Sequence, residues 1–187
     1  MFYTAAREVH WQEMTYYSSQ DLARSFRTVR NNTIQIAHDI PEASYHARPA
    51  EGTRTVLETL AHVAAQSVWQ QALHGRDRKT FVTLEDFGGY MQEAGAFGAA
   101  LTSKAAIVAA LEREGETFAS WLESLSEADL ATAVGFPPPL DPPQKSRFEM
   151  LLGVKEHEMH HRGQLMIVQR QLGVVPHLTR ARQARSA

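Results

Sequence analysis

Apolar side chains recur at spacings of three and four residues over four separate segments of this 187-residue chain. This spacing matches the repeat of an α-helix, so each segment predicts a helix with one apolar face. Four such faces in one chain can be buried against one another, which predicts an all-α protein built as a four-helix bundle. The expected helices run from about Ser18 to Asp39, Thr55 to Leu73, Lys104 to Leu125 and Lys145 to Gly173.

Two of the connections between these helices are long. The join from Gly75 to Leu101 is rich in glycine, and we expect it to be at best partly ordered by short helical turns. The join from Ser126 to Gln144 ends in GFPPPLDPPQ, whose prolines favour an extended path. Because long joins allow the chain to cross the bundle, we expect at least one crossover connection. The longest strand-like run is short, from Lys79 to Leu84.

The composition limits the class of protein. A chain of 187 residues fits one domain, with residues 1–15 as an N-terminal extension and residues 180–187 as a flexible tail. The net charge of −2 argues against a nucleic-acid partner. No stretch approaches the roughly 18 apolar residues of a membrane span, and the N-terminus does not resemble a signal peptide, so we expect a cytoplasmic protein without a membrane partner. The chain has no cysteine, so its own side chains offer only nitrogen and oxygen ligands to a transition metal.

The string His157-Glu158-Met159-His160-His161 carries the strongest chemical signal. His157 and His161 are four residues apart in a segment that reads as helix, so their imidazoles lie on one face and can bind one divalent ion. Both fall within the apolar stripe of that helix. The alternative is a pair of hydrogen-bonded core histidines. His160 points about 100° away and is expected at the flank or surface.

The string also matches H-E-x-x-H, in which the glutamate acts as a general base beside a bound zinc ion. A zinc peptidase needs a third ligand downstream, yet no Asp or Glu follows Glu158. The longer form of the motif would place Gly and His where the chain has Gln164 and Ile167. His62 in the second predicted helix is a better candidate, because it can point into the bundle from a neighbouring helix. Glu58 and Glu158 are within about one turn of the candidate ligands and are potential supporting groups.

The segment YHARPAEGTRTVLETLAHVAAQ and the C-terminal HEMHHRGQL together resemble the DinB-like family, which includes the YfiT-like metalloenzymes. The resemblance covers nearly the whole chain after about Thr15. It implies a four-helix bundle that binds a divalent metal ion through three histidines, here His62, His157 and His161. It also implies a homodimer. Family members include thiol transferases and isomerases that use low-molecular-weight thiols.

Three neutral imidazoles leave a metal ion with its full charge and with open coordination positions, as in catalytic sites. Since the chain has no cysteine, a nucleophilic sulfur must come from a cosubstrate. We therefore expect a metal-dependent transferase that activates a small thiol. The alternatives are a metal-dependent hydrolase of a small substrate, with Glu158 as base, and a non-catalytic bundle that binds a metal or small molecule. Imidazole ligands suit zinc, nickel or iron, so the sequence leaves the metal open.

Two further expectations concern residues around the site. We expect His160 and Arg162 not to bind the ion, and we expect Glu158 and Arg162 to form an ion pair one helical turn apart. An aromatic group near the N-terminus lies outside the four apolar stripes and favours a homodimer interface. Its members are Phe2, Tyr3, Trp11, Tyr16 and Tyr17. The alternative is that the N-terminal segment folds back over its own bundle and covers the open end.

Overall fold

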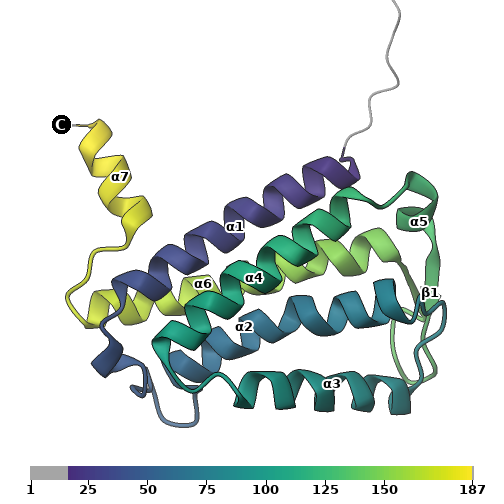
Figure 1. The fold of residues 1–187 in the computed structure, drawn as a ribbon, viewed down its shortest axis with the longest axis horizontal. Helices are drawn as coiled ribbons and strands as arrows, with labels where there is room; N and C mark the ends of the chain where they lie inside the picture. The colour runs from purple at the N-terminus through teal and green to yellow at the C-terminus, as the bar shows by residue number, and fades with distance from the viewer. Residues whose placement is uncertain (1–16, 187) are drawn as a thin grey trace, which may run out of the picture.

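The computed structural model describes residues 17–186 and has the expected all-α four-helix bundle at its centre (Figure 1). Helices α1 and α2 each pack against both α4 and α6. The fold class predicted from the four apolar stripes is therefore confirmed. The bundle helices are α1 (Ser19–Asp39), α2 (Val56–Gln71), α4 (Lys104–Glu123) and α6 (Arg147–Gln171).

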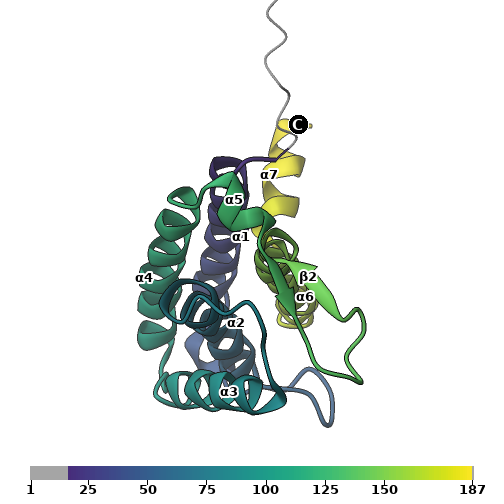
Figure 2. The same cartoon turned by 90° about the vertical axis from the view of Figure 1, so that its right-hand side faces the viewer.

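The chain direction within the bundle is set by a crossover. Figure 1 shows α2 and α4 running the same way, and α1 and α6 running together in the opposite direction. Two helices adjacent in sequence can be parallel only if the chain returns along the bundle between them. Helix α3 (Leu84–Ala99) makes that return, packed against the outer side of α2 and away from α1 (Figure 2).

Helix α3 corrects the sequence analysis, which expected only short helical turns between Gly75 and Leu101. Thr83 caps its first turn and exchanges hydrogen bonds with Asp86, a capping box that the glycine content obscured. Tyr90 is the only fully buried residue of its 16, and the other face is exposed. A helix that lies on the surface of a bundle tolerates glycines at exposed positions, because no side chain is needed there to fill a core.

The boundaries of the bundle helices follow local capping signals. Ser18 and Thr55 each accept a hydrogen bond from the backbone three residues on, and each forms a capping box, with Asp21 and Glu58 respectively. Ser103 and Ser146 cap α4 and α6 through the same side-chain contact. These starts lie within about two residues of the expected ones.

The helical path continues past Leu73, where the sequence predicted the second helix to end. The chain continues beyond α2 as a π-helical turn, η2 (Ala72–Arg76), which contains Gly75. A Cβ atom at Gly75 would lie 3.1 Å from the indole nitrogen of Trp121. Gly75 is therefore needed for the close approach of η2 to α4, and it does not terminate the helix.

The second long connection also contains structure that the sequence did not suggest. After the short helix α5 (Glu127–Ala131), strands β1 (Ala133–Gly135) and β2 (Gln144–Ser146) pair antiparallel. The proline-rich segment forms the loop between them, seen at the edge of the molecule in Figure 2. Within the run from Lys79 to Leu84, only an isolated bridge between Phe81 and Gly135 has strand pairing.

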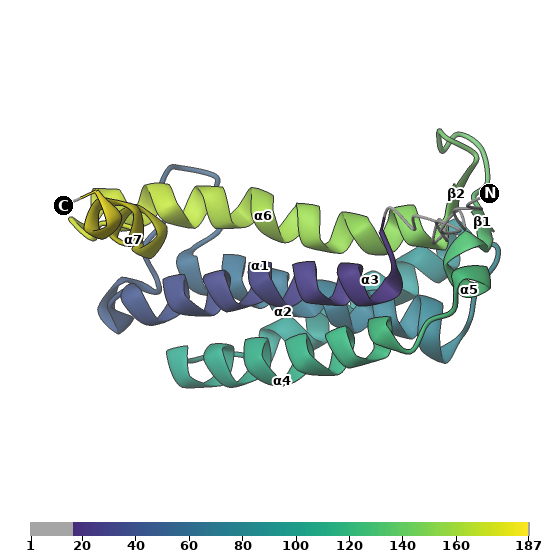
Figure 3. The ribbon, with the colours of Figure 1, turned by 90° about the horizontal axis from the view of Figure 1, so that it is seen from above.

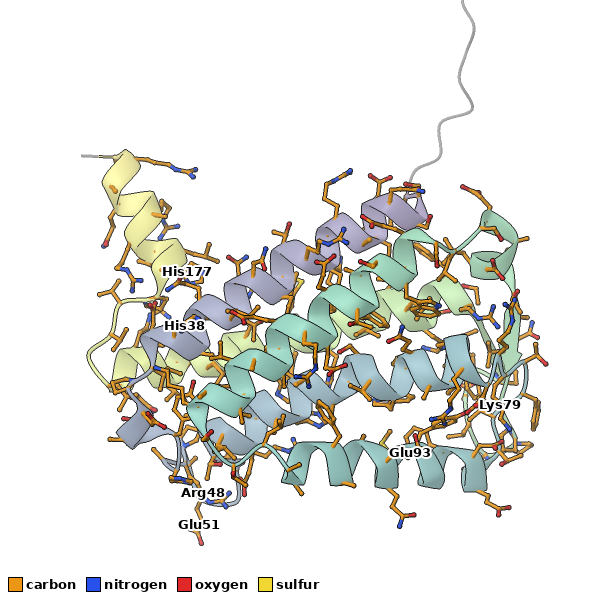
Figure 4. The ribbon with its side chains drawn as sticks, in the orientation of Figure 1. His38, Arg48, Glu51, Lys79, Glu93 and His177 are labelled. Atoms are coloured by element: carbon orange, nitrogen blue, oxygen red, sulfur yellow. The ribbon has the colours of Figure 1, made fainter. Side chains whose placement is uncertain are left out.

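The two ends of the chain can be compared with the tail and the aromatic group that the sequence predicted there. Helix α7 (His177–Arg185) includes most of the region expected to be a flexible tail. It stands away from the bundle in Figure 1 and lies over the end of α6 in the view from above of Figure 3. Arg180 forms an ion pair with Asp39, and His177 Nε2 lies 3.0 Å from Asn32 Oδ1. Figure 4 labels His177 at the start of α7 and His38 near the end of α1. The N-terminal aromatic group falls outside the described residues, apart from Tyr17.

The core consists of three apolar clusters. One of them joins all four bundle helices, at the end of the bundle where α1 and α6 finish and α2 and α4 begin. In residues 17–186, no helix combines the length and apolarity that crossing a membrane would need.

Candidate metal centre

The structure brings His62, His157 and His161 together between α2 and α6. His157 Nε2 lies 3.2 Å from His62 Nε2 and 3.1 Å from His161 Nε2. These three residues form the one group of potential metal ligands found in residues 17–186, with all their ligand atoms within 4.8 Å of one another. The helical spacing of four placed two of them on one face of α6, and the packing of α2 against α6 supplies the third.

The surroundings keep all three imidazoles neutral. Burial lowers the pKa of His62 to about 4, with further contributions from Arg54 and the other two histidines. Burial, followed by the neighbouring charge of His161, lowers the pKa of His157 to about 4. The pKa of His161 is also lowered, chiefly by burial. At neutral pH each ring therefore retains a nitrogen lone pair that can bind a cation.

Gln164, one turn beyond His161, sets the orientation of that ring. Its Oε1 lies 2.8 Å from His161 Nδ1, and its Nε2 lies 3.1 Å from the Nε2 of the exposed His160. The amide oxygen can only accept, so His161 donates from Nδ1 and keeps its lone pair on Nε2. That lone pair faces the centre of the cluster. Hydrogen bonds of this kind orient histidine ligands in metal sites.

The cluster fits a metal ion better than it fits a set of core histidines. One shared proton can satisfy only one of the close nitrogen pairs, which leaves lone pairs facing each other. A tetrahedral ion with nitrogen ligands at about 2.0–2.1 Å holds those ligands about 3.3 Å apart. The separations of His157 Nε2 from the other two nitrogens, 3.2 and 3.1 Å, are close to this value.

Glu158 has a different partner from the one expected. Its carboxylate is 1% exposed and accepts hydrogen bonds from Arg30 of α1, at 3.0 Å from Nε and 2.9 Å from Nη2. The expected pair with Arg162 is therefore wrong, because Glu158 lies on the buried side of α6. Arg30 also donates to the carbonyl oxygen of Leu111 in α4, so one guanidinium links three helices.

The other candidate supporting group, Glu58, is committed to helix capping. It accepts a hydrogen bond from the backbone of Thr55 at 2.7 Å and pairs with Arg48. Figure 4 shows Arg48 and Glu51 on the loop that precedes α2, at the edge of the molecule. Glu58 therefore stabilises the start of the helix that carries His62.

Two cavities flank the three histidines. One, of about 750 Å³, lies between the loop before α2 and the second half of α6, and His161 and Gln164 line it. The other, of about 430 Å³, lies between α2 and α3, and His62 lines it. Arg54 borders both cavities, and its charge lowers the pKa of all three histidines.

Sequence reasoning did not single out Gln164 or Arg54 as functional residues. Gln164 had a signal, since it lies three residues after His161 on the same helical face. Arg54 had a weaker signal, because it directly precedes Thr55, the cap of the helix that carries His62. Its position beside the cluster depends on how the loop before α2 folds.

Comparison with known structures agrees with this architecture. A DinB-like protein from Bacillus subtilis, YjoA, is 19% identical, with a TM-score of 0.59 over 81% of this chain and 91% of its own. YfiT from Bacillus subtilis is 12% identical, with a TM-score of 0.61 over 92% of this chain and 94% of its own. YfiT is described as a probable metal-dependent hydrolase with an unusual four-helix-bundle topology.

At the level of sequence, no curated protein shows significant similarity to the chain. The family model of the DinB superfamily, however, matches residues 25–165, from α1 into the second half of α6. This range includes His62, His157 and His161. The chain therefore belongs to the DinB superfamily.

Proposed function

We propose that this protein binds a divalent metal ion through His62, His157 and His161 and transfers a low-molecular-weight thiol to a small electrophile. The observation that supports the proposal is the cluster of three neutral imidazoles, with nitrogens 3.1 and 3.2 Å apart, between two cavities. When bound, such an ion supplies positive charge that lowers the pKa of a thiol or a water molecule beside it.

The residues of the chain have separate tasks in this proposal. The three histidines provide neutral ligands, so the charge of the ion is not cancelled. Gln164 holds His161 with its Nε2 lone pair toward the centre. The two cavities give each of two organic reactants its own approach to the histidines, which favours group transfer over a reaction with water.

Hydrolysis of a small substrate is the second candidate, and the description of YfiT favours it. Glu158 does not supply the base in our proposal, because its carboxylate is buried and bound by Arg30. A non-catalytic bundle that binds a metal or small molecule is the third candidate.

Metal binding is tested by elemental analysis of protein purified without a nickel column. We expect close to one equivalent of zinc, nickel or iron in the wild type. His157→Ala should lose the metal and remain folded, while His160→Ala should retain it, because His160 is exposed and points away. Equal metal content in His157→Ala and the wild type would contradict the proposed ligand set.

The reaction is tested by incubating the metal-loaded protein with a small thiol and an electrophilic acceptor. Formation of the thioether by the wild type, with its loss in His157→Ala, would support transfer. Hydrolysis of an ester or amide without consumption of thiol would support the second candidate. Metal binding with neither activity would support the third.

We also propose that the protein is a homodimer, which the family resemblance and the aromatic residues near the N-terminus support. A cytoplasmic location is proposed from the character of the N-terminal sequence, which does not resemble a signal peptide. Light scattering at micromolar concentration tests the dimer. A mass near 20.9 kDa, that of one chain, which does not change on dilution would contradict it.

A further inference from the structure

The cavity between α2 and α3 has apolar walls made largely of small side chains. Ala61 and Ala65 of α2 face Gly95 and Gly98 of α3, and Trp69 and Met91 lie along the same groove. Its volume of about 430 Å³ is within the range of small-molecule sites. His62 lines this groove, so a molecule bound there would lie beside the proposed metal centre.

Two charged residues, Glu58 and Arg54, line the groove, and they differ in whether they form an ion pair with another described residue. Glu58 is bound by the backbone of Thr55 and by Arg48. Arg54 is exposed, and no carboxylate among the described residues pairs with it. Its positive charge lowers the pKa of His62, His157 and His161, which places it within electrostatic reach of all three. Arg54 is therefore the charged residue of the groove that can bind a ligand, and its charge is positive.

We propose that the groove between α2 and α3 binds the electrophilic substrate, a small molecule with an apolar body and one carboxylate, and that Arg54 binds this carboxylate. The apolar walls accommodate the body, and the guanidinium provides the paired donors that suit a planar anion. The assignment of the ligand as a reactant rests on the proposed function, whereas its binding does not.

Charge recognition is tested with phenylbutyrate and its neutral analogue phenylbutyramide, by titration calorimetry on the protein as purified. The acid should bind roughly tenfold more tightly than the amide, in line with a charge-assisted hydrogen bond. Arg54→Gln should abolish this preference, and Arg54→Lys should restore part of it. Arg182→Gln, on the exposed surface of α7, is the control and should leave the preference unchanged.

The groove itself is tested by filling it. A Cβ atom at Gly95 or at Gly88 meets nothing within 4 Å, and both residues lie in α3. Of these two glycines, only Gly95 lines the groove. Gly95→Leu and Gly88→Leu should therefore raise helix propensity alike, but only Gly95→Leu should weaken binding of both probes, by about tenfold or more.

The outcomes separate this inference from the proposed metal site, provided that metal content is measured in each variant. An acid preference that persists in Arg54→Gln would show that another group, such as the metal ion, binds the carboxylate, and would overturn the inference alone. Unchanged binding in Gly95→Leu, or no binding of either probe to the wild type at millimolar concentration, would also overturn it. Arg54-dependent binding by wild-type protein that is purified without metal would leave the carboxylate-binding groove standing. It would count against the metal-dependent function and, with it, against the assignment of the ligand as a reactant.

Discussion

His157 and Glu158 are neighbours in α6, yet they belong to two buried polar groups of opposite character. Glu158 is sealed in the core, and Arg30 satisfies its carboxylate. His157 is half-buried, and its Nε2 faces two other imidazole nitrogens beside two cavities. One turn of α6 therefore carries a carboxylate whose partner lies within the protein and an imidazole whose nitrogen can bind a ligand.

The difference shows how to separate structural from functional polar residues in a bundle core. A buried ion pair whose hydrogen bonds are all made within the chain needs nothing from outside, and removal of one partner leaves an uncompensated charge. A cluster of neutral acceptors that face each other gains most from a cation. The Arg30–Glu158 pair should therefore control stability, and the histidines should control metal binding.

The largest effect is expected from breaking the ion pair. Arg30→Ala should lower the free energy of unfolding by about 3–5 kcal/mol, because it leaves the Glu158 carboxylate buried without a counter-charge. Chemical denaturation of metal-free protein measures this effect. His157→Ala, the control, should change the same quantity by much less.

The comparison would fail if Arg30→Ala and His157→Ala were equally destabilised without metal. A double variant, Arg30→Met with Glu158→Leu, sharpens the test. It should recover most of the lost stability, because neither charge remains buried.

Gly115 of α4 offers a second test of the buried Arg30–Glu158 pair. A Cβ atom there would lie 2.8 Å from Arg30 Cγ, and the guanidinium cannot move aside without losing Glu158. Gly115→Ala should therefore lower the free energy of unfolding by about 1–3 kcal/mol. Gly153→Ala in α6 is the matched control, since its Cβ atom meets nothing within 4 Å. That substitution should be neutral or slightly stabilising, and equal losses in the two variants would contradict the packing argument.

The cluster of His62, His157 and His161 is tested through Gln164. Gln164→Ala removes the acceptor that orients His161, and it should weaken metal binding by about tenfold, or about 1.4 kcal/mol, with little change in the stability of metal-free protein. Competition with a metal chelator gives the affinity. Gln171→Ala, an exposed change on the same helix, should bind metal as the wild type does. Equal affinities in the two variants would mean that Gln164 does not orient the ligand.

His74 is a third kind of buried polar residue, because it lacks a hydrogen-bond partner among the described residues and lines neither of the two cavities beside the histidines. Both its ring nitrogens lack hydrogen-bond partners in the described part of the chain, and burial, followed by the charge of Arg147, lowers its pKa to about 3. The unfolded chain, with a histidine pKa of 6.5, takes up this proton first as the pH falls. His74 therefore lowers stability progressively below about pH 6.5, by at most about 1.4 kcal/mol per pH unit.

His74→Phe should remove this contribution. Between about pH 8 and pH 5, the variant should lose less unfolding free energy than the wild type, as measured by denaturation at each pH. Parallel pH profiles for the two proteins would show that His74 is not the group responsible.

The sequence predicted the bundle and the pairing of His157 with His161 because both depend on periodicity. The convergence of His62 with this pair was implied by the family resemblance and depends on the packing of α2 against α6. The spacing of His157 and His161 within an apolar stripe placed them on one face of a buried helix. The Arg30–Glu158 pair was missed because its partners are 128 residues apart and no local pattern joins them. Helix α3 was missed because glycine lowers helix propensity, whereas a capping box and packing on α2 compensate for it.

Helix α3 has a dynamic consequence for the groove that it shares with α2. With one fully buried residue in 16, it contributes little to the core, so its local unfolding should cost far less free energy than opening of the bundle helices. Its amide hydrogens should therefore exchange with solvent well before those of α2. A groove with one such wall can widen while the histidines stay fixed on the stable helices, so the range of ligands it admits is governed by fluctuations of α3 rather than by the static volume.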